Sequence, residues 1–409
     1  MMSGASLIPF ILGGVQSDFA RHLARERLEV ADLVGELVDG ALADAQLTAA
    51  EVQTIHVGNA FGQLFTGQGQ LGAMPATVRP ALWGIPAARH EAACASGSIA
   101  ILAAMAELAA GHYDVALVLG VEQERNVTGA EAARHLGAAA WVGHEGQDAT
   151  FMWPNLFSKL GDAYAERWGL DHRHLDAIAA KNFANARVNP HAQTRAWTLG
   201  AFDDAAHNPV IEGRLRRYDC AQVTDGGAAI VLASPRFAEG WAVNRGRDLA
   251  NVPRILGWGH TTAGLPLQAK LDRSAAGGLL APHVADAANA ARRRASLGKH
   301  QISAYEIHDC FTTTEYLAID HLGLTAPGES WKAIESGATQ KTGATPINPS
   351  GGLIGGGHPV GATGVRMALD AALQVGGAAG ATQVEGATAV QTLNLGGSAT
   401  TIVSFVIGR

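Results

Sequence analysis

Cys94 stands in a sequence context that could support nucleophilic chemistry. It lies in the small, polar segment HEAACASGS, directly before an apolar helical pattern. A thiol at a helix N-terminus feels the positive end of the helix dipole, which favours the thiolate and increases its nucleophilicity. A lone cysteine is more often a buried structural residue. This context alone therefore leaves a catalytic and a structural interpretation open.

His358 lies in the glycine-rich segment NPSGGLIGGGHPVGATG. Few side chains obstruct the backbone before the His–Pro step, and Pro359 can begin a helix without losing an internal hydrogen bond. A Walker A phosphate loop would end in Gly-Lys-Ser or Gly-Lys-Thr, whereas this segment has His-Pro. The pattern favours a general base over a phosphate loop, with a plain turn as the remaining interpretation.

The segment HDCF places His308, Asp309 and Cys310 at the end of an apolar run. Reactive groups of α/β folds gather at the carboxyl ends of strands. No second cluster of ligand residues lies nearby in the sequence, so we expect no metal site. Asp309 would equally suit the bracing of a loop. Cys220 has no neighbours that suggest activation.

The elements that must position these residues alternate between short apolar runs and helical patterns, which is typical of α/β architecture. We expect helices at 30–45, 98–110, 175–188, 283–295 and 364–373. We expect strands at 55–57, 115–119, 230–233, 254–258, 305–308, 389–393 and 402–407.

A weak internal repeat relates the two halves of the chain. VQTIHVGNAF resembles SAYEIHDCF, and in each half a glycine-bearing loop then opens a helix that is followed by a strand, DVALVLG or ATAVQTLNLGG. Cys94 and His358 occupy equivalent places, each followed three residues later by a glycine, Gly97 or Gly361. Two similar halves packed back to back would bring both helix N-termini to one centre.

The stretch 121–223 interrupts this rhythm and is richer in His, Trp, Asn and Arg, which indicates an inserted lid or loop domain. TDGGAAIVLAS then resumes the first half with a buried strand. We therefore expect three units: 1–120 plus 224–250, the inserted 121–223, and 251–409.

Composition narrows the class of protein. With 409 residues, 47% of them hydrophobic and 16% charged, the chain should bury more than one core. A net charge of −7 without a basic block argues against nucleic-acid binding. Three distant cysteines without a CxxC pair indicate free thiols in a reducing compartment. No signal-peptide pattern or membrane-spanning run is present, so we expect a soluble cytoplasmic enzyme that binds no membrane.

Five motifs, in order, resemble the thiolase family over almost the whole chain. They are the nucleophile segment at Cys94, DVALVLGVEQ, TDGGAA, HDCF and GGGHPVGATG. HDCF is similar to the sterol-carrier-protein-type thiolases, whereas commoner thiolases have NEAF there. Those enzymes also carry a second catalytic cysteine near the C-terminus, where this chain reads NLGGSAT with Asn394 in that place. In the sterol-carrier branch the cysteine of HDCF supplies the acid/base function.

The resemblance implies a fold and an activity. The fold is α/β: two similar βαβαβαββ halves packed as a five-layer α-β-α-β-α sandwich, with an inserted loop domain that grips coenzyme A. The activity is cleavage of a 3-oxoacyl-CoA by CoA to acetyl-CoA and a shortened acyl-CoA, or the reverse Claisen condensation. Both directions pass through an acyl-Cys94 intermediate.

The resemblance also implies roles for site residues. His358 helps to deprotonate Cys94, and Cys310 exchanges the proton at the α-carbon. His308 and His358 hold the enolate oxygen. The backbone N–H groups of Cys94 and Gly396 hold the tetrahedral intermediate, and a side chain at 396 would be expected to crowd the acyl-cysteine.

Further expectations concern the surroundings of the site. Asn348 and Ser350 would shape the loop that bears His358. Phe151, Met152 and Trp153 would line an acyl pocket or belong to a plain core. CoA and acyl-CoA are substrates, and no permanently bound cofactor is expected. The family implies a homodimer or homotetramer. It does not indicate which residues of this chain contact the CoA nucleotide, because the motifs in that region do not align cleanly.

Three alternatives remain open at this level. A thiolase-like protein could transfer acyl groups to other acceptors, or act as a retro-aldolase with an OB-fold partner. A β-ketoacyl synthase shares the fold but would not carry a His–Asp–Cys run. A non-enzymatic binding subunit would leave two cysteines and two histidines in reactive contexts unexplained. Acylation of Cys94 separates the enzymatic interpretations from the binding one.

Overall fold

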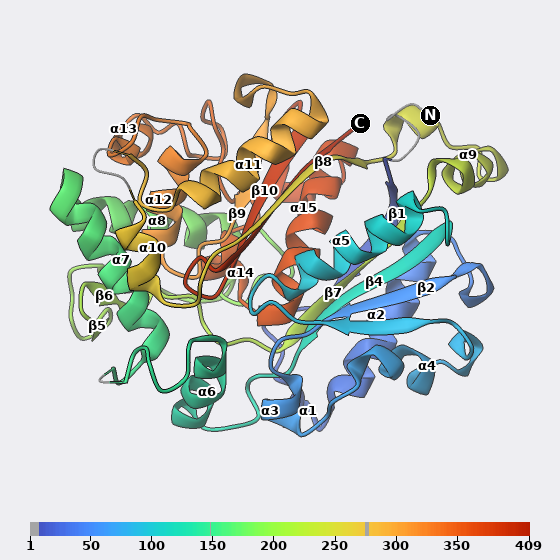
Figure 1. Cartoon of the computed structure of the whole chain (residues 1–409), viewed down its shortest axis with the longest axis horizontal. Coiled ribbons are helices and arrows are strands. Elements are labelled where there is room, and N and C mark those ends of the chain that lie inside the picture. Colours follow the sequence, from blue (N-terminus) through green and yellow to red (C-terminus); the bar gives the residue numbers. More distant parts are fainter. Residues whose placement is uncertain (1–7, 148, 275–277) are drawn as a thin grey trace.

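The computed structural model describes residues 8–147, 149–274 and 278–409 (Figure 1). Within these residues a mixed sheet has the order β3-β2-β4-β7-β1-β8-β11-β10-β9. Its strands are β1 (Phe10–Gln16), β2 (Thr54–Gly58), β3 (Ala87–His90), β4 (Val115–Glu122), β7 (Gly226–Ala233), β8 (Arg254–Thr262), β9 (Ala304–Ile307), β10 (Ala389–Gly396) and β11 (Thr401–Gly408).

The sheet consists of two similar halves, which confirms the predicted repeat. In the first half β2 pairs parallel with β4, which pairs antiparallel with β7, and β7 pairs antiparallel with β1. In the second half β9 pairs parallel with β10, which pairs antiparallel with β11, and β11 pairs antiparallel with β8. One residue pair, Phe10 with Arg254, joins β1 to β8 across the boundary.

Helices cover the two half-sheets in layers (Figure 1). Helix α2 (Val30–Asp44) packs on the outer face of the first half, in a core with β2, β4 and β7. Helices α5 (Ser96–Ala109) and α15 (Thr363–Gly376) share the central core between both halves. Helices α11 (Pro282–Ala295) and α12 (Thr312–His321) cover the outer face of the second half. The result is the expected α-β-α-β-α sandwich.

Glycines allow the two central helices to begin close together. A Cβ atom added to Gly97 would lie 2.7 Å from the carbonyl oxygen of Gly361, and one added to Gly120 would lie 2.6 Å from Cα of Ala362. Backbone therefore packs on backbone at the point where both helices start. This contact brings the segments of Cys94 and His358 to the same centre.

The inserted stretch folds into helices that pack against the second half. It contains α6 (Gly129–Leu136), α7 (Met152–Trp168), α8 (His172–Ala186) and a ribbon of β5 (Val210–Glu212) and β6 (Leu215–Arg216). Figure 1 shows α7 and α8 beside α12 and α13 (Ser330–Glu335). The boundaries of the three expected units remain predictions.

Several polar contacts attach the inserted helices to α12. The Tyr164 hydroxyl on α7 donates to Oδ2 of Asp320 at 2.8 Å. Lys181 on α8 forms an ion pair with Glu315, and both side chains are almost fully buried. Removing one partner of such a pair would leave an uncompensated buried charge. The inserted region is therefore fixed rigidly to the half that carries His308.

All the predicted strands and helices are present, with ends shifted by a few residues. The elements outside the predicted set include β1, β3, α6, α7, α12 and α13. They also include α1 (Leu23–Glu26), α3 (Gly62–Thr66), α4 (Met74–Val78), α9 (Pro235–Asn244), α10 (Leu267–Asp272) and α14 (Gly352–Gly356).

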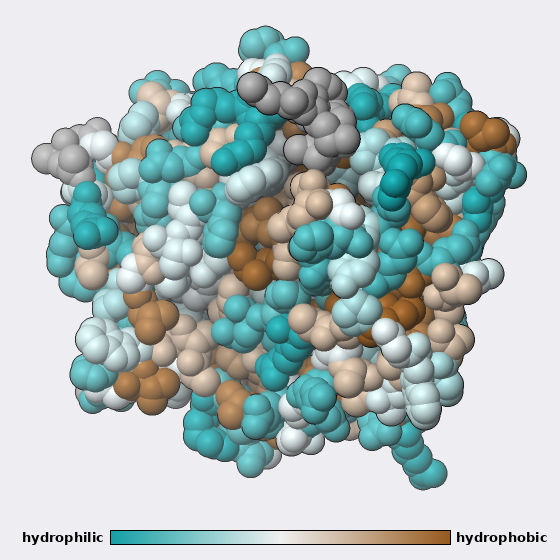
Figure 2. All heavy atoms as spheres, turned by 45° about the vertical axis from the view of Figure 1, so that its right-hand side comes forward, coloured by the Kyte–Doolittle hydropathy of each residue, from teal (hydrophilic) through white to brown (hydrophobic). Residues whose placement is uncertain are grey.

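The surface is mostly hydrophilic on the face in Figure 2, where hydrophobic side chains form small separate patches. Within the described residues, the helices are too short or too polar to cross a membrane. Residues 1–7, part of the N-terminal segment considered above, lie outside the described part of the chain.

Candidate active site

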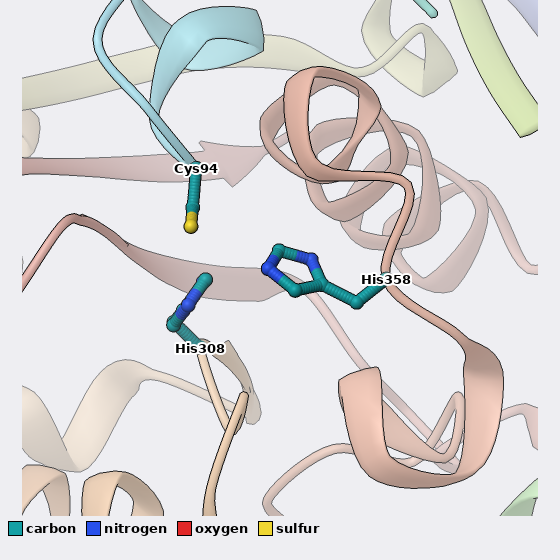
Figure 3. A group of neighbouring side chains, drawn as sticks. All are labelled: Cys94, His308 and His358. Carbon is teal, nitrogen blue, oxygen red and sulfur yellow. The ribbon is translucent and has the colours of Figure 1, made fainter. Parts of the chain in front are cut away.

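Cys94 sits on a tight turn immediately before α5. Ala93 adopts a left-handed conformation with φ of 50°, which is costly for a residue with a Cβ atom and persists only where the surroundings hold it. The Ser96 hydroxyl donates to the carbonyl of Ala93 at 2.6 Å and accepts from the N–H of Ala92 at 2.9 Å. This turn points the Cys94 side chain away from the helix, into the space between the two halves (Figure 3).

His358 is held by two threonines. Its backbone N–H donates to Oγ1 of Thr224 at 2.9 Å, and its Nδ1 lies 2.7 Å from Oγ1 of Thr363. The Thr363 hydroxyl itself donates to the carbonyl of Pro359 at 3.2 Å. Its oxygen is therefore free to accept a proton from Nδ1, which leaves Nε2 of the neutral ring as a hydrogen-bond acceptor.

His308 is oriented by a chain of side-chain hydrogen bonds. The Ser98 hydroxyl donates to Oδ1 of Asn394 at 2.8 Å, which turns the amide Nδ2 toward Nδ1 of His308 at 3.2 Å. Because Nδ1 accepts this bond, the proton of the neutral ring sits on Nε2. His308 is thus prepared as a donor, the opposite of His358. The motifs alone assigned no role to Asn394, which stands where the commoner thiolases have a cysteine.

The three side chains meet at one point (Figure 3). One ligand atom each from Cys94, His308 and His358 lies within 4.8 Å of the others. The two imidazole rings are 5.2 Å apart between centroids, with planes at 82°. The expected convergence of Cys94, His308 and His358 is therefore observed, although their catalytic roles remain predictions.

Cys310 stands two residues before α12. It lines a cavity of about 650 Å³ together with Cys94 and His358. Its sulfur lies 3.8 Å from Oγ1 of Thr314. The cavity falls within the usual size of small-molecule sites.

Most of the cavity wall comes from the inserted stretch 121–223. Phe151, Met152 and Trp153 all line it, as expected for an acyl pocket. Cys220, which seemed unremarkable in the sequence, also lines it. Other lining residues are His22, Phe61, Glu124, Arg125, Val127, Leu136, Phe157, Gln193, Trp197, Ile211, Arg217, Gln222, Phe311, Val360 and Gly397.

Burial sets the protonation states of the site. It raises the pKa of the Cys94 thiol to about 12, and Glu124 and Glu122, once ionised, act in the same direction. It lowers the pKa of His358 to about 3 and holds the pKa of His308 well below its usual range. The expectation that the helix dipole would favour a thiolate is wrong for the substrate-free protein, because desolvation outweighs the dipole. Cys94 and His358 rest as a neutral thiol and a neutral base.

This resting state predicts a steep pH dependence of alkylation. Iodoacetamide reacts with the thiolate, so modification of Cys94 should accelerate about tenfold per pH unit from pH 7 to pH 10. An ordinary exposed thiol would level off near its pKa of about 8.5. The rate is measured by mass spectrometry of the Cys94 peptide, with Cys94→Ala as the control for modification of Cys220 or Cys310. A plateau below pH 8 would instead indicate a preformed thiolate–imidazolium pair.

Asp309 braces the loop that carries His358, which resolves its ambiguous sequence context. Its carboxylate accepts from the N–H of Leu353 at 2.6 Å and from the side-chain amide of Asn182 at 2.8 Å. This contact ties the HDCF segment to the glycine-rich segment before His358. It also links both to α8 of the inserted region.

Asn348 and Ser350 fix the same loop to β9 and α12. Oδ1 of Asn348 accepts from the N–H of Ile307 at 2.8 Å, and its amide donates to Glu315 at 3.0 Å. The Ser350 hydroxyl donates to buried Glu306 at 2.7 Å. These contacts support the expected shaping role of both residues.

Gly396 lies against the turn of Cys94. A Cβ atom there would lie 2.2 Å from the carbonyl oxygen of Ala92 and 3.2 Å from the N–H nitrogen of Ala95. The backbone behind the nucleophile therefore imposes a steric demand of its own, and crowding of an acyl-cysteine stays a prediction. The N–H of the next residue, Gly397, lies against the Cys94 sulfur and lowers the pKa of its thiol. Gly396 remains the predicted oxyanion donor, and Gly397 is a second backbone donor that the sequence did not indicate.

The close packing of Gly396 predicts a stability loss on substitution. Gly396→Ala should destabilise the fold by about 1–3 kcal/mol, because the Ala92 backbone must move. Gly240→Ala on α9 is the matched control, since a Cβ atom there meets nothing within 4 Å. Urea unfolding of both variants measures the difference. Equal stability of the two variants would show that the turn accommodates a methyl group freely.

Two groups of three residues within the described chain bring possible metal ligands together. One is the Cys94, His308 and His358 group, and the other is His172, Asp176 and Asp219. Both oxygens of Asp219 already accept protein hydrogen bonds, and His172 lies 3.4 Å from this carboxylate. We assign no metal to either group.

Comparisons with known proteins identify the family of the chain. The family model of the thiolase N-terminal domain matches residues 10–236, and that of the thiolase C-terminal domain matches residues 270–409. An acetyl-CoA acetyltransferase of Methanothermobacter thermautotrophicus is 30% identical and covers 92% of this chain and 94% of its own length. Sterol carrier protein 2 of Homo sapiens is 28% identical and covers 98% of this chain and 72% of its own length.

The comparison with solved structures gives a consistent result for the fold. The solved structure described as the Ltp2-ChsH2(DUF35) aldolase matches with a TM-score of 0.77 at 20% identity, covering 100% of this chain and 99% of that one. At this identity the likeness concerns the fold alone. Together with the family models and the relatives, it leads to one conclusion: the chain belongs to the thiolase family.

Proposed function

We propose that this protein is an acyl-CoA C-acyltransferase that cleaves 3-oxoacyl-CoA with CoA, or runs the reverse Claisen condensation. The observation that carries the proposal is the meeting of Cys94, His308 and His358 within 4.8 Å, with Cys94 and His358 on the wall of a largely apolar cavity. A thiol beside a neutral imidazole acceptor is suited to nucleophilic attack on a carbonyl carbon.

In the first half-reaction His358 takes the proton of Cys94 through Nε2 as the sulfur attacks the 3-oxo carbon. The tetrahedral oxyanion then collapses, the bond between the α- and β-carbons breaks, and the acyl group stays on Cys94. Cys310 donates its thiol proton to the α-carbon of the departing acetyl-CoA enolate. The raised pKa of Cys310, caused by burial, keeps that proton available at neutral pH.

Hydrogen-bond donors stabilise the charge that develops on oxygen. His308 already carries its proton on Nε2, as its bond with Asn394 requires. His358 gains one there after it accepts the proton of Cys94, so both rings can donate to the enolate oxygen. The backbone N–H groups of Cys94 and Gly396 are the proposed donors for the tetrahedral intermediate. Losing one such donor typically costs about two to three orders of magnitude in rate.

The second half-reaction restores Cys94, Cys310 and His358 to their starting protonation states. The Cys310 thiolate removes the proton of an incoming CoA thiol, whose sulfur attacks the acyl-Cys94 thioester. Cys94 leaves as a thiolate and recovers its proton from His358. Because the cycle is closed, the same groups serve the condensation, and metabolite concentrations decide the net direction.

The inserted region is the proposed site of CoA binding, since it provides most of the cavity wall. No permanently bound cofactor is part of the proposal. We place the activity in the cytoplasm and expect a homodimer or homotetramer, as the family resemblance implies. A role in fatty-acid degradation or another branch of lipid metabolism follows if long acyl chains are preferred.

The test is CoA-dependent cleavage of acetoacetyl-CoA, 3-oxooctanoyl-CoA and 3-oxohexadecanoyl-CoA by the purified chain. Formation of acetyl-CoA and the shortened acyl-CoA, followed by chromatography, is the expected result. Folded protein that cleaves none of these substrates would contradict the proposal. That result would favour the retro-aldolase interpretation, which requires an OB-fold partner.

A further inference from the structure

Glu124 places a carboxyl group in the cavity that the proposed mechanism does not use. It follows the end of β4 by two residues and lines the same cavity as Cys94 and Cys310. Its side chain is 1% exposed. Among the residues that the structure describes, neither carboxyl oxygen has a hydrogen-bond partner.

Glu122 provides an instructive contrast on the same strand. It is equally buried, but its Oε1 accepts from the N–H groups of Ala60 and Phe61 and so anchors the segment after β2. Glu124 makes no bond that meets hydrogen-bond geometry among the described residues, although the N–H groups of Val360 and Thr224 are close enough to lower its pKa in part. A buried polar group without a partner destabilises the fold, so a structural role does not account for it.

The surroundings of Glu124 keep it protonated. Burial raises its pKa well above the usual range, and negative charge on Glu122 and Asp225 acts in the same direction. Arg125 turns away and donates to the carbonyl of Arg21 at 2.9 Å. His22, also on the cavity wall, is largely neutral because burial and Arg125 lower its pKa. Glu124 is therefore a carboxylic acid whose O–H is free to donate.

Much of the cavity wall is apolar. Phe151, Met152, Trp153, Phe157 and Trp197 line it, so an acyl chain would lie against hydrocarbon and aromatic surface. A plain aliphatic chain would exclude water from the cavity and leave the carboxylic acid of Glu124 without a hydrogen-bond partner. A chain with a suitably placed oxygen would satisfy it.

We propose that Glu124 determines substrate specificity by donating a hydrogen bond to an oxygen on the acyl chain beyond the 3-oxo carbon. The preferred substrate class is then a 3-oxoacyl-CoA whose chain carries a hydroxyl or carbonyl group. This inference rests on the proposed acyl-CoA function for its reaction, but the recognition can be measured as binding alone. Sites built to pair a substrate hydroxyl discriminate strongly against analogues that lack it.

The experiment measures dissociation constants by calorimetry with acyl-CoA thioesters. Every protein in the calorimetry carries Cys94→Ala, because the reverse of the second half-reaction would otherwise move the acyl group from CoA to Cys94. In the calorimetry, wild type refers to position 124. The probes are octanoyl-CoA and its 5-, 6- and 7-hydroxy derivatives, tested on wild type, Glu124→Leu and Glu124→Gln. At least one hydroxy derivative should bind wild type about tenfold more tightly than octanoyl-CoA. Glu124→Leu should lose this preference, and Glu124→Gln, whose amide can still donate, should retain part of it.

Controls separate recognition from damage to the fold. Glu239→Gln removes a carboxyl group that is exposed on α9, and this variant should keep the wild-type preference for hydroxy derivatives. Glu124→Leu should melt no lower than wild type, because it removes an unpaired buried carboxyl. A matching change in kcat/KM on the corresponding 3-oxo substrates would extend the result to catalysis.

The possible outcomes distinguish this inference from the proposed function. Equal binding of all four thioesters by wild type, or a preference that survives in Glu124→Leu, would overturn the role of Glu124 while leaving thiolysis intact. A preserved preference in a protein without thiolytic turnover would remove the proposed reaction and keep the recognition. Failure of wild type to bind any of the thioesters would overturn both.

Discussion

Cys94→Ala should reduce CoA-dependent cleavage of 3-oxoacyl-CoA by about 10⁵-fold, because no other group can carry the acyl chain between the two half-reactions. The loss should appear in kcat, since the cavity that binds substrate remains. Chromatographic quantification of acetyl-CoA formed by wild type and variant measures it over this range.

Cys220→Ala is the matched control for this prediction. Cys220 is another thiol in the same cavity, but it donates to the carbonyl of Arg216 at 3.3 Å and is not part of the group formed by Cys94, His308 and His358. The control variant should keep at least a tenth of the wild-type rate. A Cys94→Ala protein that is no slower than Cys220→Ala would remove Cys94 from the mechanism.

Cys310→Ala should separate the two kinds of chemistry at this site. Exchange of the α-protons of acetyl-CoA with deuterated water should slow by about 10²–10⁴-fold, the usual contribution of a positioned acid or base. Acylation of Cys94 should continue, because it depends on His358. Nuclear magnetic resonance of acetyl-CoA follows the exchange, and intact-protein mass spectrometry follows acylation.

The selectivity of this effect is what tests the assignment. A merely structural role of Cys310 would impair both measurements together, since its sulfur packs against Thr314 on α12. Unchanged exchange in a folded Cys310→Ala protein would show that another group moves the proton, and His308 would be the next candidate to replace.

Much of the fold was predictable because its strands are buried on both faces. β4, β7 and β11 are nearly continuous apolar runs, and helices on either side explain why alternation is absent from them. The repeat was visible because β2 and β9 end in similar segments. Both the apolar strands and the repeat can be recognised within short stretches of sequence, and for that reason they could be predicted.

The missed elements have identifiable causes. β1 contains Gly13 and Gly14, which break its apolar run and are required because a Cβ at Gly14 would lie 2.6 Å from the Ala229 carbonyl. β3 is a short edge strand with little burial. α12 is buried on every side, so its sequence TTTEYLAIDH shows no amphipathic period, and its polar groups pair with partners such as Lys181.

The candidate active site was also predictable only in part. Cys94, His308, Cys310 and His358 were identified from residue type and local segment. Their orientation was not predictable, because it depends on distant pairs: Ser98 and Asn394 are 296 positions apart. The protonation state of Cys94 was also missed, since burial by remote segments outweighs the local helix dipole.

The central claim is that the acyl group passes through Cys94. Wild-type protein mixed with 3-oxooctanoyl-CoA in the absence of free CoA should accumulate a thioester, which acid quenching preserves for peptide mapping. The account predicts a hexanoyl group on the peptide that contains Cys94, with release of acetyl-CoA. Release of acetyl-CoA without any acylated peptide, or a hexanoyl group on Cys220 or Cys310 instead, would contradict it.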